Sequence, residues 1–110
     1  MKAIVKNAIS RLKTGAAAVA SKPGVDYPLQ GETITSRQYT YRIAAPETAE
    51  SVDISINQGP WLACRNAAGY WWYDWAGYCN GKYEVIARIP GKNGRWTMTL
   101  PNEFSVLLKP

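Results

Sequence analysis

Few side chains in this sequence could carry out catalysis. Histidine is absent from the 110 residues, which removes the commonest general base and the commonest metal ligand. A Ser–His or Cys–His nucleophile therefore cannot be assembled within the chain. The eight Asp and Glu residues are scattered, and Glu47, Glu50 and Asp53 lie at predicted turns or at outward strand positions. We expect neither enzyme activity nor a cofactor, and a role in binding instead.

The two cysteines, Cys64 and Cys79, lack the CxxC spacing of a zinc or redox site. Without histidine the chain has too few soft ligands for zinc, so we expect no metal site. A disulfide between the two cysteines is expected only if the protein is exported. The sequence favours free, buried thiols.

The stretch Tyr70–Trp75 carries more aromatic side chains than a strand needs for its core face. Successive side chains of a strand point to opposite faces of the sheet. One face would carry Trp71, Tyr73 and Trp75, and the other would carry Tyr70, Trp72 and Asp74. Because an unpaired carboxylate is costly to bury, we expect the Asp74 face to be the one in contact with water.

Exposed clusters of large aromatic side chains usually mark binding surfaces. The predicted binding face comprises Trp61, Tyr70, Trp72, Asp74 and Tyr78. Such a face suits another protein, or a sugar whose C–H face stacks on a ring beside a polar acceptor. The alternative is that Tyr70 and Trp72 are covered by an N-terminal helix or by a loop.

Short segments of alternating polarity must position these aromatic residues. The clearest is 51–56, where Val52, Ile54 and Ile56 alternate with polar side chains. Further strands are predicted at 38–43, 61–65, 70–75, 82–89, 95–100 and 104–108, and Asn80-Gly81 is typical of a hairpin turn. About seven short strands at regular spacing predict an all-β antiparallel sandwich. Its expected core is Val52, Ile54, Ile56, Trp71, Tyr73, Val85, Ala87 and Ile89.

Residues 1–24 differ from the rest of the chain in charge. They contain five basic residues and no acidic residue, whereas residues 25–110 contain eight of each. Their apolar side chains recur at helical spacing, which predicts an amphipathic helix over 2–14 that ends near Gly15. The apolar face carries Ile4, Val5, Ile9 and Leu12, and the basic face carries Lys2, Lys6, Arg11 and Lys13. We therefore expect a helical arm with its linker over 1–24 and a β-sandwich over 25–110.

Three surfaces could receive this arm. An isolated helix of this length is marginal in water, so its apolar face is expected to pack on its own sandwich, on a partner subunit or on a membrane surface. The neutral body argues against a nucleic-acid partner. Lys6, Arg11 and Lys13 interrupt the apolar core that a signal peptide needs. We therefore expect a cytoplasmic protein.

The order of strands and turns resembles a known class of domains. The segment 45–58 runs into Gly59-Pro60-Trp61, then into GYWWYDW at 69–75 and GKYEVIARI at 81–89. This order resembles the early-set immunoglobulin-like domains over residues 38–94. Two branches are similar: the dimerisation domain of sulfite oxidase-type molybdenum enzymes, and the glycogen- and starch-binding modules that precede amylase-type catalytic domains. The N-terminal arm matches neither branch.

The resemblance implies an immunoglobulin-like sandwich and two possible functions. The first is a non-catalytic protein-binding or assembly module, a small accessory subunit that joins another protein or a second copy of itself. The second is a carbohydrate-binding module for an α-glucan. The residues support a binding function in either case and leave the choice of partner open.

Overall fold

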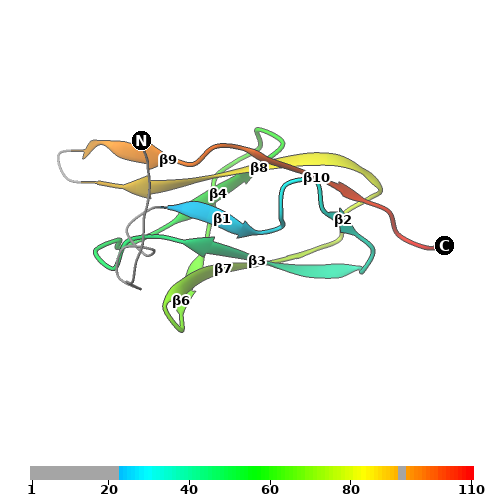
Figure 1. The fold of residues 1–110 in the computed structure, drawn as a ribbon, viewed down its shortest axis with the longest axis horizontal. Coiled ribbons are helices and arrows are strands. Elements are labelled where there is room, and N and C mark those ends of the chain that lie inside the picture. The colour runs from blue at the N-terminus through cyan, green and yellow to red at the C-terminus, as the bar shows by residue number, and fades with distance from the viewer. Residues whose placement is uncertain (1–22, 92–93) are drawn as a thin grey trace, which may run out of the picture.

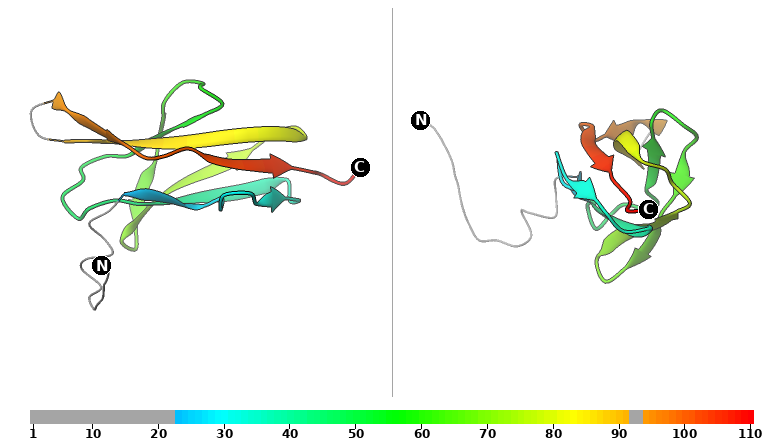
Figure 2. Two further views of the ribbon diagram at one scale, coloured as in Figure 1. Left: turned by 45° about the horizontal axis from the view of Figure 1, so that its top comes forward. Right: turned by 90° about the vertical axis from the view of Figure 1, so that its right-hand side faces the viewer.

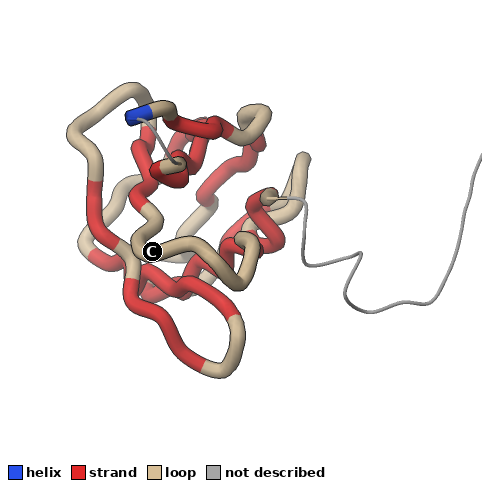
Figure 3. Tube along the Cα trace, turned by 90° about the vertical axis from the view of Figure 1, so that its left-hand side faces the viewer, coloured by secondary structure: helices blue, strands red, loops and turns tan. Residues whose placement is uncertain are grey.

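The computed structural model describes residues 23–91 and 94–110. Strands dominate this part of the chain (Figure 3). The described residues form ten strands, most of which are labelled in Figure 1. They are β1 (Gly24–Tyr27), β2 (Thr33–Ile34), β3 (Gln38–Ala44), β4 (Asp53–Ile56), β5 (Leu62–Ala63), β6 (Arg65–Ala67), β7 (Tyr70–Ala76), β8 (Gly81–Pro90), β9 (Trp96–Met98) and β10 (Asn102–Val106). The predicted arm helix over 2–14 lies outside the described residues. Over the described residues no helical segment has the length and hydropathy of a membrane span.

The strands form two sheets that pack as layers (Figure 2). Sheet A has the order β1-β3-β7-β6, and sheet B has the order β2-β10-β8-β4-β5, with β9 as a further partner of β8. Every pairing is antiparallel except that of β2 with β10. The all-β sandwich prediction is confirmed. The structure has more strands than the seven or so predicted, because it includes very short strands such as β2 and β5, each of two residues.

The core lies between the inner faces of the two sheets. Six of the eight predicted core side chains are buried, and the other two, Ile56 and Tyr73, are half-buried and pack against them. The buried apolar residues are Ile34, Tyr41, Ile43, Ala45, Val52, Ile54, Trp71, Val85, Ala87, Ile89, Phe104 and Val106. The period-two pattern therefore identified the inner faces of β4, β7 and β8 correctly.

Tyr41 lies at the centre of an aromatic group in this core. Its ring meets those of Tyr39, Tyr73, Trp75 and Phe104 edge to face, with centroids 5.4–6.3 Å apart, an arrangement that suits the quadrupoles of the rings. The Tyr41 side chain is fully buried, and its hydroxyl has no hydrogen-bond partner within the described chain. Burial raises the pKa of this hydroxyl far above its ordinary value, so it stays neutral.

The predicted hairpin at Asn80-Gly81 is wrong. β7 belongs to sheet A and pairs with β3 and β6, whereas β8 belongs to sheet B and pairs with β10 and β4. Both strands are therefore occupied on both edges, and the turn carries the chain from one sheet to the other. The Asn80 side chain accepts a hydrogen bond from the Leu108 N–H at 2.7 Å, which ties this crossing to the segment that follows β10.

Candidate binding surfaces

The outer face of sheet A carries a row of alternating aromatic and basic side chains. Residues opposite one another in antiparallel strands share a face, so the strand register defines the row. Its members are Tyr27, Arg42, Trp72 and Arg65, on β1, β3, β7 and β6 respectively. The row crosses the whole sheet.

Arg42 is the centre of this face. Its guanidinium carbon lies 4.3 Å from the centroid of the Tyr70 ring and 4.8 Å from that of Tyr27, within range of a cation–π interaction. Its Nε donates to Asp26 Oδ2 at 3.0 Å. The ring of Trp72 meets that of Tyr70 edge to face at 6.0 Å. We call Tyr27, Arg42, Tyr70, Trp72 and Asp26 the sheet A cluster.

Beside this cluster lies an exposed ion pair. Thr40 Oγ1 donates to Asp74 Oδ1 at 3.0 Å, and Arg65 Nη2 approaches both carboxylate oxygens at 3.3 Å. The Thr40 hydrogen bond and the Arg65 guanidinium lower the pKa of Asp74. Trp72, Arg65 and Asp74 together line a shallow pocket of about 290 Å³. A flat ring, a cation and an anion therefore face one small volume.

The outer face of sheet B repeats the arrangement around Arg88. Its guanidinium carbon lies 4.3 Å from the centroid of Trp61 and 4.1 Å from that of Trp96. Its Nε donates to Asp53 Oδ2 at 3.0 Å, and Asp53 is opposite Arg88 in the register. We call Trp61, Arg88, Trp96 and Asp53 the sheet B cluster.

The apolar side chains of β9 point away from the core. Arg88 is opposite Met98, whereas Thr97 is opposite the buried Ile89, and Thr99 Oγ1 accepts a hydrogen bond from the Ala87 N–H. Thr97 and Thr99 thus lie on the same face of the sheet as Ile89 and Ala87, with Thr97 exposed and Thr99 half-buried. The exposed apolar residues are Trp96 (46% exposed), Met98 (57%) and Leu100 (86%), and we call them the apolar stripe.

The structure divides the predicted aromatic face. Tyr70, Trp72 and Asp74 lie together on the outer face of sheet A, as predicted. Trp61 lies instead in the cluster on sheet B. Tyr78 stacks on Trp75 with ring centroids 3.9 Å apart and packs against the core, because its hydroxyl donates to the Ser36 carbonyl at 2.7 Å. The arm residues Lys2, Ile4, Val5, Lys6, Ile9, Arg11, Leu12 and Lys13 lie outside the described residues.

Sequence reasoning missed both arginines and the apolar stripe. The ring partners of Arg42 and Arg88 come from distant strands, so no local spacing links them. The stripe had one local signal: the run Trp96–Leu100 alternates apolar side chains with threonine and contains no charged residue. That alternation predicts a strand but does not say which of its faces is buried.

The predicted cysteine state is half confirmed. Both thiols are free, but only Cys64 is partly buried, while Cys79 is exposed. Burial and, to a smaller extent, the charge of Asp53 raise the pKa of Cys64 to about 12. Among the described residues no group of three or more Cys, Asp or Glu side chains could hold a metal ion.

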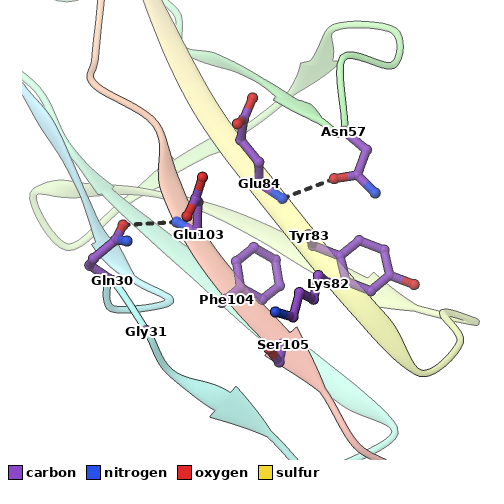
Figure 4. A pocket seen from close by; sticks show the side chains of 9 residues that line it. All are labelled: Gln30, Gly31, Asn57, Lys82, Tyr83, Glu84, Glu103, Phe104 and Ser105. Atoms are coloured by element: carbon purple, nitrogen blue, oxygen red, sulfur yellow. Dashed lines mark hydrogen bonds between the residues drawn. The ribbon is translucent and has the colours of Figure 1, made fainter.

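A groove of about 410 Å³ lies over β8 and β10, and Figure 4 shows the side chains that line it. Glu84 and Glu103 are opposite each other in the register. Their backbone N–H groups donate to the side-chain oxygens of Asn57 and Gln30, at 2.9 and 2.8 Å. The groove is therefore an open polar surface whose strand N–H groups are already bonded within the chain.

No protein-family model matches the sequence, and no curated protein matches it. Among solved structures, fibronectin(III)-like modules of CbhA from Clostridium thermocellum align over 77% of this chain and 94% of theirs, with a TM-score of 0.64 and 17% identity. CopC from Methylosinus trichosporium OB3b aligns over 82% of this chain and 93% of its own, with a TM-score of 0.55 and 16% identity. An engineered protein aligns over 91% of this chain and 22% of its own, with a TM-score of 0.66 and 19% identity.

These structures support the predicted immunoglobulin-like fold. They give no support to the two narrower resemblances, to sulfite oxidase-type and starch-binding domains. At identities this low the likeness concerns the backbone arrangement alone. The body of the chain has the fold of a fibronectin III-like β-sandwich.

Proposed function

We propose that this chain is a non-catalytic protein-binding module, an assembly or accessory subunit whose partner docks on the outer face of sheet B. The observation that carries the proposal is the orientation of β9: Thr97 lies on the same face as the buried Ile89 but is itself exposed, and the apolar stripe points to water from the opposite face. Contiguous exposed apolar side chains mark interaction sites. Tryptophan, methionine and arginine are also the side chains enriched in protein interfaces.

Arg88 makes this surface suitable for a partner. Its guanidinium lies between Trp61 and Trp96 and is paired with Asp53, so these long side chains are held in place before binding. Binding then orders fewer side chains, which lowers the entropic cost of association. The apolar stripe continues outward from this fixed centre.

Paired substitutions test the proposal. Met98→Ser and Leu100→Ser should abolish co-purification of a protein partner from the native source, because they remove the two most exposed members of the apolar stripe. Leu29→Ser and Leu107→Ser are matched controls, since these leucines are 55% and 61% exposed and lie outside the stripe. Loss of the partner in the control variants, or its retention in the stripe variants, would contradict the proposal.

We propose that the basic segment 1–24 adds to this association. It contains all of the excess positive charge of the chain, and the sandwich strands begin only at Gly24. Deleting residues 1–22 should leave the melting temperature nearly unchanged and weaken partner binding. Unfolding of the body on deletion would assign the segment to the core instead.

A second candidate function is binding of an α-glucan at the pocket beside Trp72. The supporting observation is that a ring, the Asp74 carboxylate and the Arg65 guanidinium line one pocket. Trp72→Leu should abolish the retardation of the protein in gels containing glycogen, and Trp61→Leu, on the other sheet, should not. If the wild-type protein migrates normally with glycogen and with starch, this function is excluded.

A further inference from the structure

The outer edge of β9 is open. The strand pairs with β8 on one side, and in the part of the chain that the structure describes no strand pairs with its other side. Figure 2 shows β9 at the margin of its layer. Unpaired N–H and C=O groups on such an edge are a template for another strand.

The direction of the backbone groups follows from the pairing with β8. The Thr99 N–H donates to the Ala87 carbonyl at 2.9 Å, and Thr97 is opposite Ile89. Backbone groups of successive strand residues point to alternate sides. The N–H and C=O groups of Trp96, Met98 and Leu100 therefore point to the open edge, in the same residues whose side chains form the apolar stripe.

Other edges of the two sheets are better protected than this one. β2 and β5 are two residues long, and β1 is followed by Pro28 after a register shift. Proteins block exposed edges with short strands, prolines, bulges and charges. β9 itself is three residues long, but backbone hydrogen bonds with the β8 side continue to Arg95 before it and to Thr99 after it. The segment Trp96–Leu100 contains no proline and no charged side chain, whereas β6, the three-residue edge strand of sheet A, begins with Arg65. We therefore consider the β9 edge the one suited to pairing.

We propose that a second copy of this chain pairs with β9, antiparallel, about a two-fold axis at Met98. This inference rests on the proposed function and specifies its partner. The sequence Trp96-Thr97-Met98-Thr99-Leu100 has the same polarity pattern in both directions. Antiparallel pairing about its centre sets apolar side chains against apolar side chains and threonine against threonine.

In the paired arrangement, each exposed side chain of the apolar stripe has an apolar neighbour in the second copy. Trp96 of one copy lies opposite Leu100 of the other, and the two Met98 side chains face each other at the axis. About six backbone hydrogen bonds join the strands, and sheet B becomes continuous across both copies. Such an interface is isologous, so it closes at two copies and does not propagate.

The charge of the sandwich body is compatible with a second copy, and the net charge of +5 on each chain lies in residues 1–24. The paired strand segments carry no charge, and residues 25–110 contain equal numbers of acidic and basic side chains. Two bodies therefore approach without net repulsion. A strongly basic or acidic partner would find no complementary charge in the apolar stripe.

Introducing a charge of either sign at Met98 in the full-length chain tests the proposal, with sedimentation equilibrium as the measurement. The wild-type chain should form dimers as its concentration rises. Met98→Lys and Met98→Glu should each weaken dimerisation at least about tenfold, because like charges would meet at the axis. Mixing the two variants should restore a dimer that contains one copy of each. Leu107→Lys and Leu107→Glu, on an exposed leucine outside the stripe, should dimerise like the wild type.

Three results would overturn this inference. One is a wild-type chain that is monomeric at every concentration. Another is a dimer that survives each Met98 charge variant, which would place the interface elsewhere. The third is a monomer that dimerises only when residues 1–22 are deleted, which would show that this segment occupies the edge. The proposed function would still stand in each case if Met98→Ser releases a different co-purifying protein.

Discussion

The outer faces of the two sheets share one arrangement of side chains but differ in the residues that surround it. On each face an arginine lies over two aromatic rings and donates through Nε to an aspartate at 3.0 Å. On sheet A the surrounding polar groups are bonded: Trp72 Nε1 donates to the Ala67 carbonyl at 2.8 Å, and Asp74 pairs with Arg65 and Thr40. On sheet B the arrangement continues into the apolar stripe.

Under the proposed function, this difference makes the outer face of sheet B the partner-binding surface. A guanidinium between two rings covers apolar area while it keeps its charge near water. Either arginine can therefore cover the outer face of a sheet on which no further layer packs. On sheet A the arrangement ends with the bonded polar groups around the cluster. On sheet B the apolar stripe continues past the cluster and is exposed, and this is the surface to which we assign the partner.

The largest expected difference is between the reactivities of the two thiols, which lie at two places where the chain passes between the sheets. Cys64 should react with a thiol reagent at least about 100-fold more slowly than the exposed Cys79 at neutral pH, because the thiolate is the reactive form. Since burial raises the pKa of Cys64 to about 12, its rate should keep rising with pH up to that value. Mass spectrometry of labelled peptides over time measures both rates.

The same measurement distinguishes the two clusters. Asp53→Asn, on sheet B, removes a charge that raises the Cys64 pKa and should speed its labelling. Asp26→Asn, the equivalent change on sheet A, should leave the rate unchanged. Equal acceleration in both variants would show general loosening of the fold in place of a local charge effect.

Truncation of the two arginines should rank the clusters by stability. Arg88→Ala is expected to lower the free energy of unfolding by about 2–3 kcal/mol and Arg42→Ala by about 1–2 kcal/mol, from lost cation–π contacts and an ion pair. The order follows burial, since the Arg88 and Asp53 side chains are 25% and 20% exposed and those of Arg42 and Asp26 are 30% and 31% exposed. Urea denaturation measures both values. Arg37→Ala is the control on an exposed arginine, and a larger loss for Arg42→Ala would reverse the comparison.

Tyr41→Phe tests whether the buried Tyr41 hydroxyl, which has no hydrogen-bond partner in the described chain, destabilises the core between the two sheets. Removing a buried hydroxyl that lacks a partner should raise the free energy of unfolding by about 1 kcal/mol. Tyr83→Phe is the matched control, because the Tyr83 hydroxyl donates to the Cys79 carbonyl at 2.7 Å and its loss should be destabilising. A destabilised Tyr41→Phe variant would instead reveal a buried water bound to the hydroxyl.

The smallest effect is expected at Asp74, beside the sheet A cluster. Because Thr40 and Arg65 lower its pKa in the folded chain, its contribution to stability is present above its ordinary pKa and is lost as the pH falls through the lowered value. Asp74→Asn should therefore remove a small increment near neutral pH and none in strong acid. Melting temperatures across acidic pH would show the two curves converging. Curves that stay parallel would mean that the Asp74 ion pair contributes nothing through its charge.

The sequence was most informative where a side chain's environment depends on its own strand. Burial of Val52, Ile54 and Val85, and the outward direction of Tyr70 and Trp72, follow from a period of two along one chain segment. The local turn signal failed at Asn80-Gly81, since a turn between two strands forms a hairpin only if those strands pair. Whether they pair depends on β3, β4, β6 and β10.

Composition and the alternating pattern therefore determined an all-β body with two amphipathic sheets, and the absence of histidine limited the chemistry available to it. The tertiary structure decided which outward side chains meet. Arg42 and Arg88 acquire their ring partners from strands remote in the chain, and β9 turns its apolar face to water because its register with β8, and not its own sequence, determines which of its faces lies on the core side. An alternating strand has two equivalent faces until its neighbours are in place, and only the assembled sheets make that choice.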